Sequence, residues 1–126
     1  LARFCELYRR AIALAQSAGA EVMLASLVPI DAVKYMNFIS RGLSYDNILS
    51  WLGDINMLYR WHEGYNRAVE QLAVEHSLPL LDLRSGFLSD HAFKSLICDD
   101  GIHPTQAGHK IIEDIAVGTL SCPGVA

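Results

Sequence analysis

Apolar residues recur every three or four positions at the start of the chain. This spacing predicts an amphipathic helix with one buried face, formed by Phe4, Leu7, Tyr8, Ala11, Leu14, Ala15 and Ala18. Gly19 then supplies a natural stop. Residues 22–28 are almost continuously apolar, which is typical of a strand buried on both faces, and Pro29 ends that run.

Residues 30–54 follow a less regular pattern. Asp31 is a candidate N-cap for a short helix that extends through Phe38. Gly42 breaks this segment, and Gly53 closes a second short segment around Trp51. We therefore expect a short helix followed by a second short segment here.

The second half of the chain repeats the change from helix to strand. Apolar spacing over residues 58–72 predicts a helix that stops near His76, with Glu63 and Arg67 paired on it, and residues 80–83 predict a second short strand. A short helix is expected over 89–97. A last helix is expected after Pro104, capped by Thr105 and ending at Gly118. Strands that alternate with helices favour an α/β fold with a parallel sheet.

Composition narrows the class of protein. The chain has 126 residues, 52% of them hydrophobic, and a net charge of −4, which together suit one packed domain. There is no basic run to bind nucleic acid, and no apolar stretch approaches the roughly 20 residues of a membrane span. Because the first residue is Leu1 and not Met, we expect a piece of a longer protein, and the compartment cannot be deduced.

The three cysteines do not form a recognisable site. Cys5, Cys98 and Cys122 are widely spaced and lack a C-x-x-C pair, so we interpret them as small hydrophobic residues. We expect no metal and no organic cofactor.

The stretch from Asp100 to Gly108 is the most informative part of the sequence. Pro104 disfavours the helical conformation for His103, so the imidazole is expected on an extended residue just before a helix. Gly101 allows a tight turn that can bring the Asp100 carboxylate to one ring nitrogen of His103. Such a pair fixes the tautomer of a general base. The alternative is a surface turn in which both residues merely cap the following helix.

The same stretch, Asp-Gly-Ile-His-Pro with Gly108 beyond it, resembles the last sequence block of the SGNH (GDSL) ester hydrolases. The likeness extends upstream, to residues 19–29, 65–73 and 80–83, and so covers most of the chain. It implies a flavodoxin-like three-layer αβα fold with a parallel sheet, of which residues 1–126 are the C-terminal part. It also implies that His103 is the general base of a catalytic triad and Asp100 its orienting acid.

The nucleophile block of that family is missing from this sequence. None of the ten serines lies in Gly-Asp-Ser or Gly-x-Ser-x-Gly, and Gly53-Asp54 and Gly64-Tyr65-Asn66 are chance fragments of the family's other blocks. The resemblance therefore implies a carboxylic ester hydrolase that works through a serine acyl-enzyme on a small-molecule or glycan ester. We expect this chain to supply only Asp100 and His103, and to be inactive alone.

The sequence is also compatible with two other functions. An acyltransferase can use the same acyl-enzyme chemistry, and a non-catalytic interaction module can keep the fold. Two strands make a poor sheet, so we expect the N-terminal half of the same protein, or a second copy, to complete it.

Other polar and aromatic residues are also candidates for the site. Asp99 competes with Asp100 for the orienting role, but we prefer Asp100. His109, with His103 and Asp99, has poor spacing for a metal site, and a solvated His109 is favoured. Asp82 is interpreted as a satisfied structural residue. Four aromatic residues could wall an acyl pocket or pack their own small core: Tyr35, Phe38, Tyr45 and Trp51.

Overall fold

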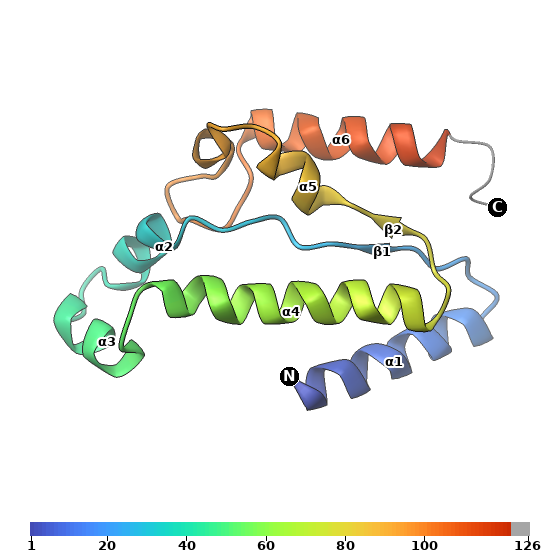
Figure 1. Cartoon of the computed structure of the whole chain (residues 1–126), viewed down its shortest axis with the longest axis horizontal. Helices are drawn as coiled ribbons and strands as arrows, with labels where there is room; N and C mark the ends of the chain where they lie inside the picture. The colour runs from blue at the N-terminus through green and yellow to red at the C-terminus, as the bar shows by residue number, and fades with distance from the viewer. Residues whose placement is uncertain (122–126) are drawn as a thin grey trace.

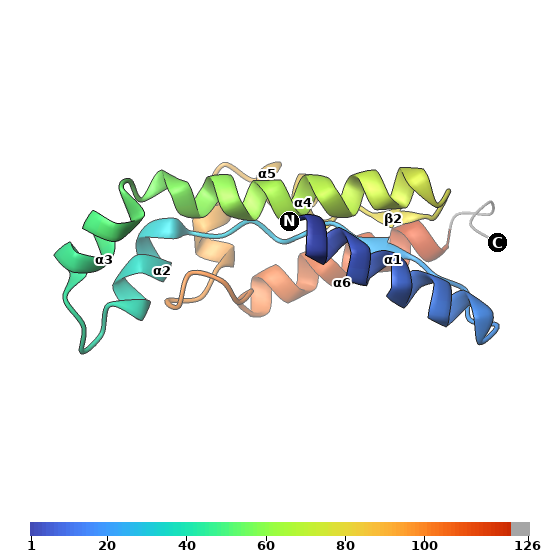
Figure 2. The ribbon, with the colours of Figure 1, turned by 90° about the horizontal axis from the view of Figure 1, so that it is seen from below.

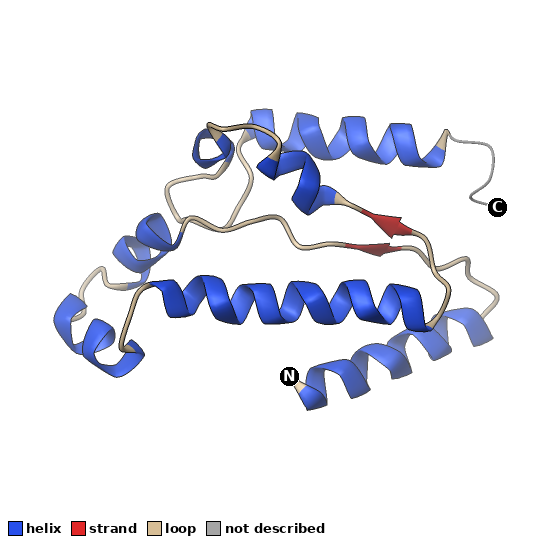
Figure 3. Ribbon diagram, viewed as in Figure 1, coloured by secondary structure: helices blue, strands red, loops and turns tan. Residues whose placement is uncertain are grey.

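The computed structural model describes residues 1–121. It contains six α-helices, one 3-10 helix and two strands in these residues (Figures 1 and 3). In chain order they are α1 (Ala2–Ser17), β1 (Leu24–Ala25), α2 (Ala32–Ile39), α3 (Tyr45–Leu52), α4 (Asn56–Glu75), β2 (Leu80–Leu81), α5 (Leu83–Leu88), η1 (Phe93–Leu96) and α6 (Gln106–Leu120). Cys122 lies outside the described residues.

The two strands form a small parallel sheet, in which Leu24 is opposite Leu80 and Ala25 is opposite Leu81. The connection between them runs through helices α2, α3 and α4, as the alternating pattern predicts for parallel strands. The chain is therefore mostly helical with an α/β core.

Both strands are shorter than the sequence predicts. Ser26 still donates its N–H to the Leu81 carbonyl at 3.0 Å, but the next N–H, of Leu27, donates instead to the Asn66 side chain at 2.8 Å. On the other strand, Asp82 accepts the N–H of Ser85 at 3.0 Å and so begins helix α5. The prediction of a strand through residue 83 was therefore wrong at its end, because a helix cap competes with the ladder.

Two hydrophobic clusters lie against the sheet. The first joins α1 and α4 to the strands and is formed by Ile12, Leu24, Val69, Leu72 and Ala73. The second joins α5, η1 and α6 and is formed by Phe87, Leu96 and Ile97, with Val28, Phe93, Ile111 and Ile112 packed against it. Figures 1 and 2 show α1 and α4 together on one side of the strands, and Figure 1 shows α6 on the opposite side. Burial on these faces is the main source of stability.

Helix α1 exposes part of its predicted buried face. Ile12 is buried and Phe4 and Tyr8 are partly buried, whereas Leu7 and Leu14 are 49% and 72% exposed. Arg9 on the polar side makes a bidentate ion pair with Glu75 of α4 at 2.8 Å. The apolar residues of α1 thus form two adjoining stripes, and within residues 1–121 only the stripe of Phe4, Tyr8 and Ile12 is covered.

The predicted helix over residues 89–97 was also wrong. The structure instead places α5 before this segment and the short 3-10 helix η1 within it. Asp90 turns the chain by accepting the N–H of Ala92 at 2.7 Å. The last helix begins as predicted, with the Thr105 hydroxyl accepting the N–H of Gly108 at 3.3 Å, and it continues two residues beyond Gly118.

Candidate active site

A closed loop between η1 and α6 carries Asp100 and His103. Its base is an antiparallel bridge between Ile97 and Pro104. The Cys98 N–H donates to the His103 carbonyl at 2.8 Å, and the Gly101 N–H donates to the Cys98 carbonyl at 3.0 Å. The loop backbone is therefore held by its own hydrogen bonds on both sides of the histidine.

The loop brings the two predicted residues into contact. His103 Nδ1 lies 2.5 Å from Asp100 Oδ2. Asp100 Oδ1 accepts the backbone N–H groups of Ile102 and His103, each at 3.0 Å. Asp100 thus uses both oxygens, one for the backbone and one for the ring.

These contacts determine the charge of Asp100. The N–H of Ile102, the His103 ring and the N–H of His103 all stabilise the carboxylate, and they lower the pKa of Asp100 from 3.8 to about 2. An ionised carboxylate has no proton to donate, so Nδ1 of His103 must carry the shared proton. The other ring nitrogen, Nε2, is then the free base of the neutral ring.

The two side chains differ in exposure. The His103 side chain is 72% exposed and that of Asp100 only 20%. The His103 imidazole is therefore accessible to a second group, while the Asp100 carboxylate is held in the turn. Asp99, the rival for the orienting role, is exposed and next to this pair, and the ring contact recorded for the loop is with Asp100.

Helix α2 places this loop. The Asp31 N–H donates to the Gly101 carbonyl at 2.9 Å. Gly101 has φ +82°, and a Cβ on it would lie 2.2 Å from the Tyr35 backbone nitrogen. Only glycine allows both this backbone conformation and this approach.

Gly108 plays a similar part on the α6 side. A Cβ there would lie 2.6 Å from the Leu96 carbonyl oxygen and 3.2 Å from Phe87. The absence of a side chain lets the first turn of α6 sit directly on the second hydrophobic cluster. The helix that follows His103 is therefore fixed at its start.

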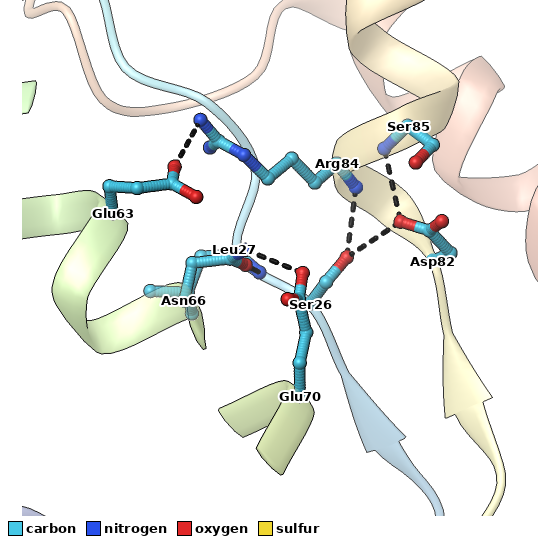
Figure 4. Close-up of polar contacts among 8 residues, drawn as sticks. All are labelled: Ser26, Leu27, Glu63, Asn66, Glu70, Asp82, Arg84 and Ser85. Carbon is cyan, nitrogen blue, oxygen red and sulfur yellow. Dashed lines mark hydrogen bonds and ion pairs between the residues drawn. The ribbon is translucent and has the colours of Figure 1, made fainter. Parts of the chain in front are cut away.

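A second polar cluster surrounds the carboxyl ends of the strands and is shown in Figure 4. Ser26 is buried, accepts the Arg84 N–H at 2.9 Å and lies 3.3 Å from Asp82 Oδ1. Asn66 is 1% exposed and joins the Leu27 N–H to Glu70. This cluster, formed by Ser26, Asn66, Glu70 and Asp82 with Glu63 and Arg84, is called the strand-end cluster below.

The strand-end cluster revises two sequence interpretations. Asp82 is hydrogen-bonded as expected, but as the cap of α5 and not within a strand, and its pKa is lowered first by hydrogen bonding to Ser85. Glu63 pairs with Arg84 at 2.6 Å and not with Arg67. Asn66 lies in the Gly64-Tyr65-Asn66 fragment and is a buried residue that accepts the N–H of Leu27, far away in the sequence.

The remaining candidates lie apart from the loop or on the surface. His109 is exposed on α6, and residues 1–121 contain no group of three or more His, Cys, Asp or Glu side chains able to hold a metal ion. Phe38, Tyr45 and Trp51 are 42%, 37% and 78% exposed at the α2–α3 end of the molecule. Trp51 meets Trp61 of α4 edge to face, with ring centroids 6.1 Å apart.

Comparison with known proteins gives the class. The sequence model of the GDSL-like Lipase/Acylhydrolase family matches residues 1–111. The chain belongs to this family. Ester hydrolysis, in the broad sense, is the activity that the family suggests. A search of curated proteins finds no match. No helix within residues 1–121 has the length and apolar character needed to cross a membrane.

Proposed function

We propose that this chain provides the base half of a serine ester hydrolase, with His103 as general base and Asp100 as its orienting acid. The observation that carries the proposal is the 2.5 Å contact between His103 Nδ1 and a carboxylate fixed by two backbone N–H groups. Membership of the lipase/acylhydrolase family supports the ester as substrate. The exposed ring leaves Nε2 accessible to a nucleophile.

The chemistry divides into two half-reactions. His103 Nε2 accepts the proton of a serine hydroxyl while the serine oxygen bonds to the ester carbonyl carbon. The tetrahedral intermediate then expels the alcohol, whose oxygen takes the proton back from Nε2. In the second half, Nε2 removes a proton from water, the hydroxide oxygen attacks the acyl carbon, and the serine oxygen leaves with the proton. Asp100 stabilises the imidazolium in both halves.

The serine is proposed to come from outside these 126 residues, because none of the ten serines lies in a family nucleophile motif. Ser26, the buried serine, already contacts Arg84 N–H and Asp82. We propose a flavodoxin-like three-layer domain in which another segment of the same protein, or a second copy, adds strands beside β1. Within the described residues β1 pairs only with β2, so the edge is open to such pairing.

The test is to trap the acyl-enzyme. The assembled enzyme is mixed with a p-nitrophenyl ester, quenched during the initial burst, and digested for mass spectrometry. We expect the acyl group on a serine outside residues 1–126, and the 126-residue chain alone to hydrolyse the ester no faster than buffer. An acyl group on Asp100, on His103 as a stable product, or on a serine of this chain would contradict the proposal.

The assembly is tested separately by size-exclusion chromatography with light scattering. We expect the chain alone to form dimers or larger species, because an unpaired apolar strand edge recruits another strand. A monodisperse monomer with a cooperative melting transition would show that the two-stranded sheet is sufficient.

A further inference from the structure

The loop that carries Asp100 and His103 is tied to α2 by a lysine from outside the loop. Lys34 Nζ donates to the Ile97 carbonyl at 2.6 Å and to the Lys94 carbonyl at 3.0 Å. Both acceptors lie at the foot of the loop, and Ile97 itself forms the bridge with Pro104. One ammonium group thus joins α2, η1 and the first residue of the loop.

The two carbonyls differ in their surroundings, since the contact to the Ile97 carbonyl is partly buried and the contact to the Lys94 carbonyl is exposed. The Lys94 carbonyl also accepts the Ile97 N–H, but at 3.4 Å, and Ile97 is 1% exposed. An unpaired carbonyl at the buried Ile97 is costly, whereas a charged donor makes a strong hydrogen bond with it. The Lys34 contacts therefore matter more than those of a typical surface lysine.

The contacts of Asp31 also hold the loop against α2. Asp31 caps α2 by accepting the N–H groups of Val33 and Lys34, and its own N–H donates to Gly101. Lys34 and Asp31 therefore hold opposite parts of the loop, Lys34 at its foot and Asp31 at its tip. Lys94 Nζ, at 3.9 Å from Asp31 Oδ2, adds a weaker contact.

We propose that Lys34 is a positioning residue of the active site: by binding the foot of the 97–104 loop, its ammonium sets where the His103 ring stands relative to the attacking serine. This inference rests on the proposed function for its catalytic consequence. Lys34 does not touch His103, and it acts through the backbone of Ile97 and Lys94. A displacement of about 1 Å at a general base is enough to slow the reaction about 100-fold.

The experiment compares Lys34→Met, Lys34→Arg and the control Lys110→Met in the assembled enzyme. Lys110 is a surface lysine, 61% exposed, that pairs with Glu113 and Asp114 on α6. We expect Lys34→Met to lower kcat about 10- to 100-fold with KM changed less than about twofold. Lys34→Arg keeps a charged donor and is expected to restore most of kcat, and Lys110→Met to behave as wild type.

Amide hydrogen exchange gives a readout that does not depend on activity. In Lys34→Met the N–H groups of Ile102 and His103, which donate to Asp100, are expected to exchange about tenfold faster while amides of α4 keep their protection. Either a wild-type kcat or wild-type exchange of these two amides in Lys34→Met would overturn the inference, as would equal loss of protection throughout the chain.

The two proposals fail separately. If His103→Ala kept full activity, the proposed function would fall, and the exchange experiment would still decide whether Lys34 holds the loop. If His103→Ala were inactive while Lys34→Met had normal kcat, only the positioning role would fall. Should Lys34→Met not fold, Lys34→Gln takes its place, with an intermediate loss of kcat as the supporting result and wild-type kcat as the contrary one.

Discussion

The Asp100–His103 pair and the strand-end cluster are both built from polar side chains, yet they differ in what the side chains are free to do. In the strand-end cluster Ser26 and Asn66 are almost fully buried. Ser26 accepts the backbone N–H of Arg84, and Asn66 accepts that of Leu27. In the pair, the Asp100 carboxylate is hydrogen-bonded to the backbone and to the His103 ring, while the His103 imidazole is 72% exposed. A side chain can act as a general base only if its proton-accepting atom is left accessible.

The strongest contrast is expected from His103→Ala. In the assembled enzyme we expect kcat to fall by about three to six powers of ten, because the serine loses its base. The urea unfolding midpoint is expected to stay close to wild type, because the ring is mostly exposed. Steady-state ester hydrolysis and urea titration measure the two quantities. His109→Ala, which removes an exposed histidine of α6, is the control. A loss of only a few-fold would mark His103 as structural.

Gly101→Ala tests the backbone beneath the pair. Gly42 has a similar φ of +77° but open space around its Cβ position, so Gly42→Ala reports the backbone strain alone, about 1–2 kcal/mol. Gly101→Ala adds a clash with Tyr35 and Asp31 backbone atoms, and we expect a total loss of about 2–5 kcal/mol in unfolding free energy and a lower kcat. Equal effects of the two substitutions would show that the loop shifts freely away from α2.

Asn66→Ala tests the strand-end cluster in the opposite way. It removes the acceptor of the Leu27 N–H, so we expect about 1–3 kcal/mol of lost stability and an unchanged kcat per folded molecule. Chemical denaturation and active-site titration separate these quantities. The control is Asn37→Ala, at an exposed position of α2. A fall in kcat without a fall in stability would mean that Asn66 takes part in the chemistry.

Acid unfolding gives the smallest expected effect. The pKa of Asp100 is about 2 when folded against 3.8 for the free side chain. Its stabilising contribution is therefore complete above about pH 4 and is lost as the pH falls toward 2. The difference in urea midpoint between wild type and Asp100→Asn should shrink over this range. A difference that stays constant down to pH 2 would show that ionisation of Asp100 is not its source.

Two features set by neighbouring residues were predictable from the sequence, and two features set by distant residues were not. The Thr105 cap and the Asp100–His103 contact each depend on residues three positions apart, and the structure contains both. The family resemblance was confirmed over residues 1–111. Asn66 and Lys34 could not be foreseen, because their partners Leu27 and Ile97 lie 39 and 63 residues away.

The errors have a common physical cause. Residues 80–83 and 22–28 are apolar enough for longer strands, but the ladder ends where Asp82 caps a helix and Asn66 takes the Leu27 N–H. Apolar character predicts burial and does not reveal which hydrogen-bond partner wins. The exposed Leu7 and Leu14 show the same limit, since periodicity does not distinguish two adjoining stripes when only one is covered.

The bridge between Ile97 and Pro104 has a consequence for the order of folding. It closes the short 97–104 loop. Closing a short loop costs little chain entropy, and it takes from less than about 1 microsecond to a few microseconds. The Asp100 carboxylate can therefore select the His103 tautomer while the rest of the chain is still searching for its contacts. Lys34, 63 residues from Ile97, joins at a later step. The contact that fixes the tautomer of the histidine is thus local in the sequence, whereas the Lys34 contact that places the loop joins residues 63 apart.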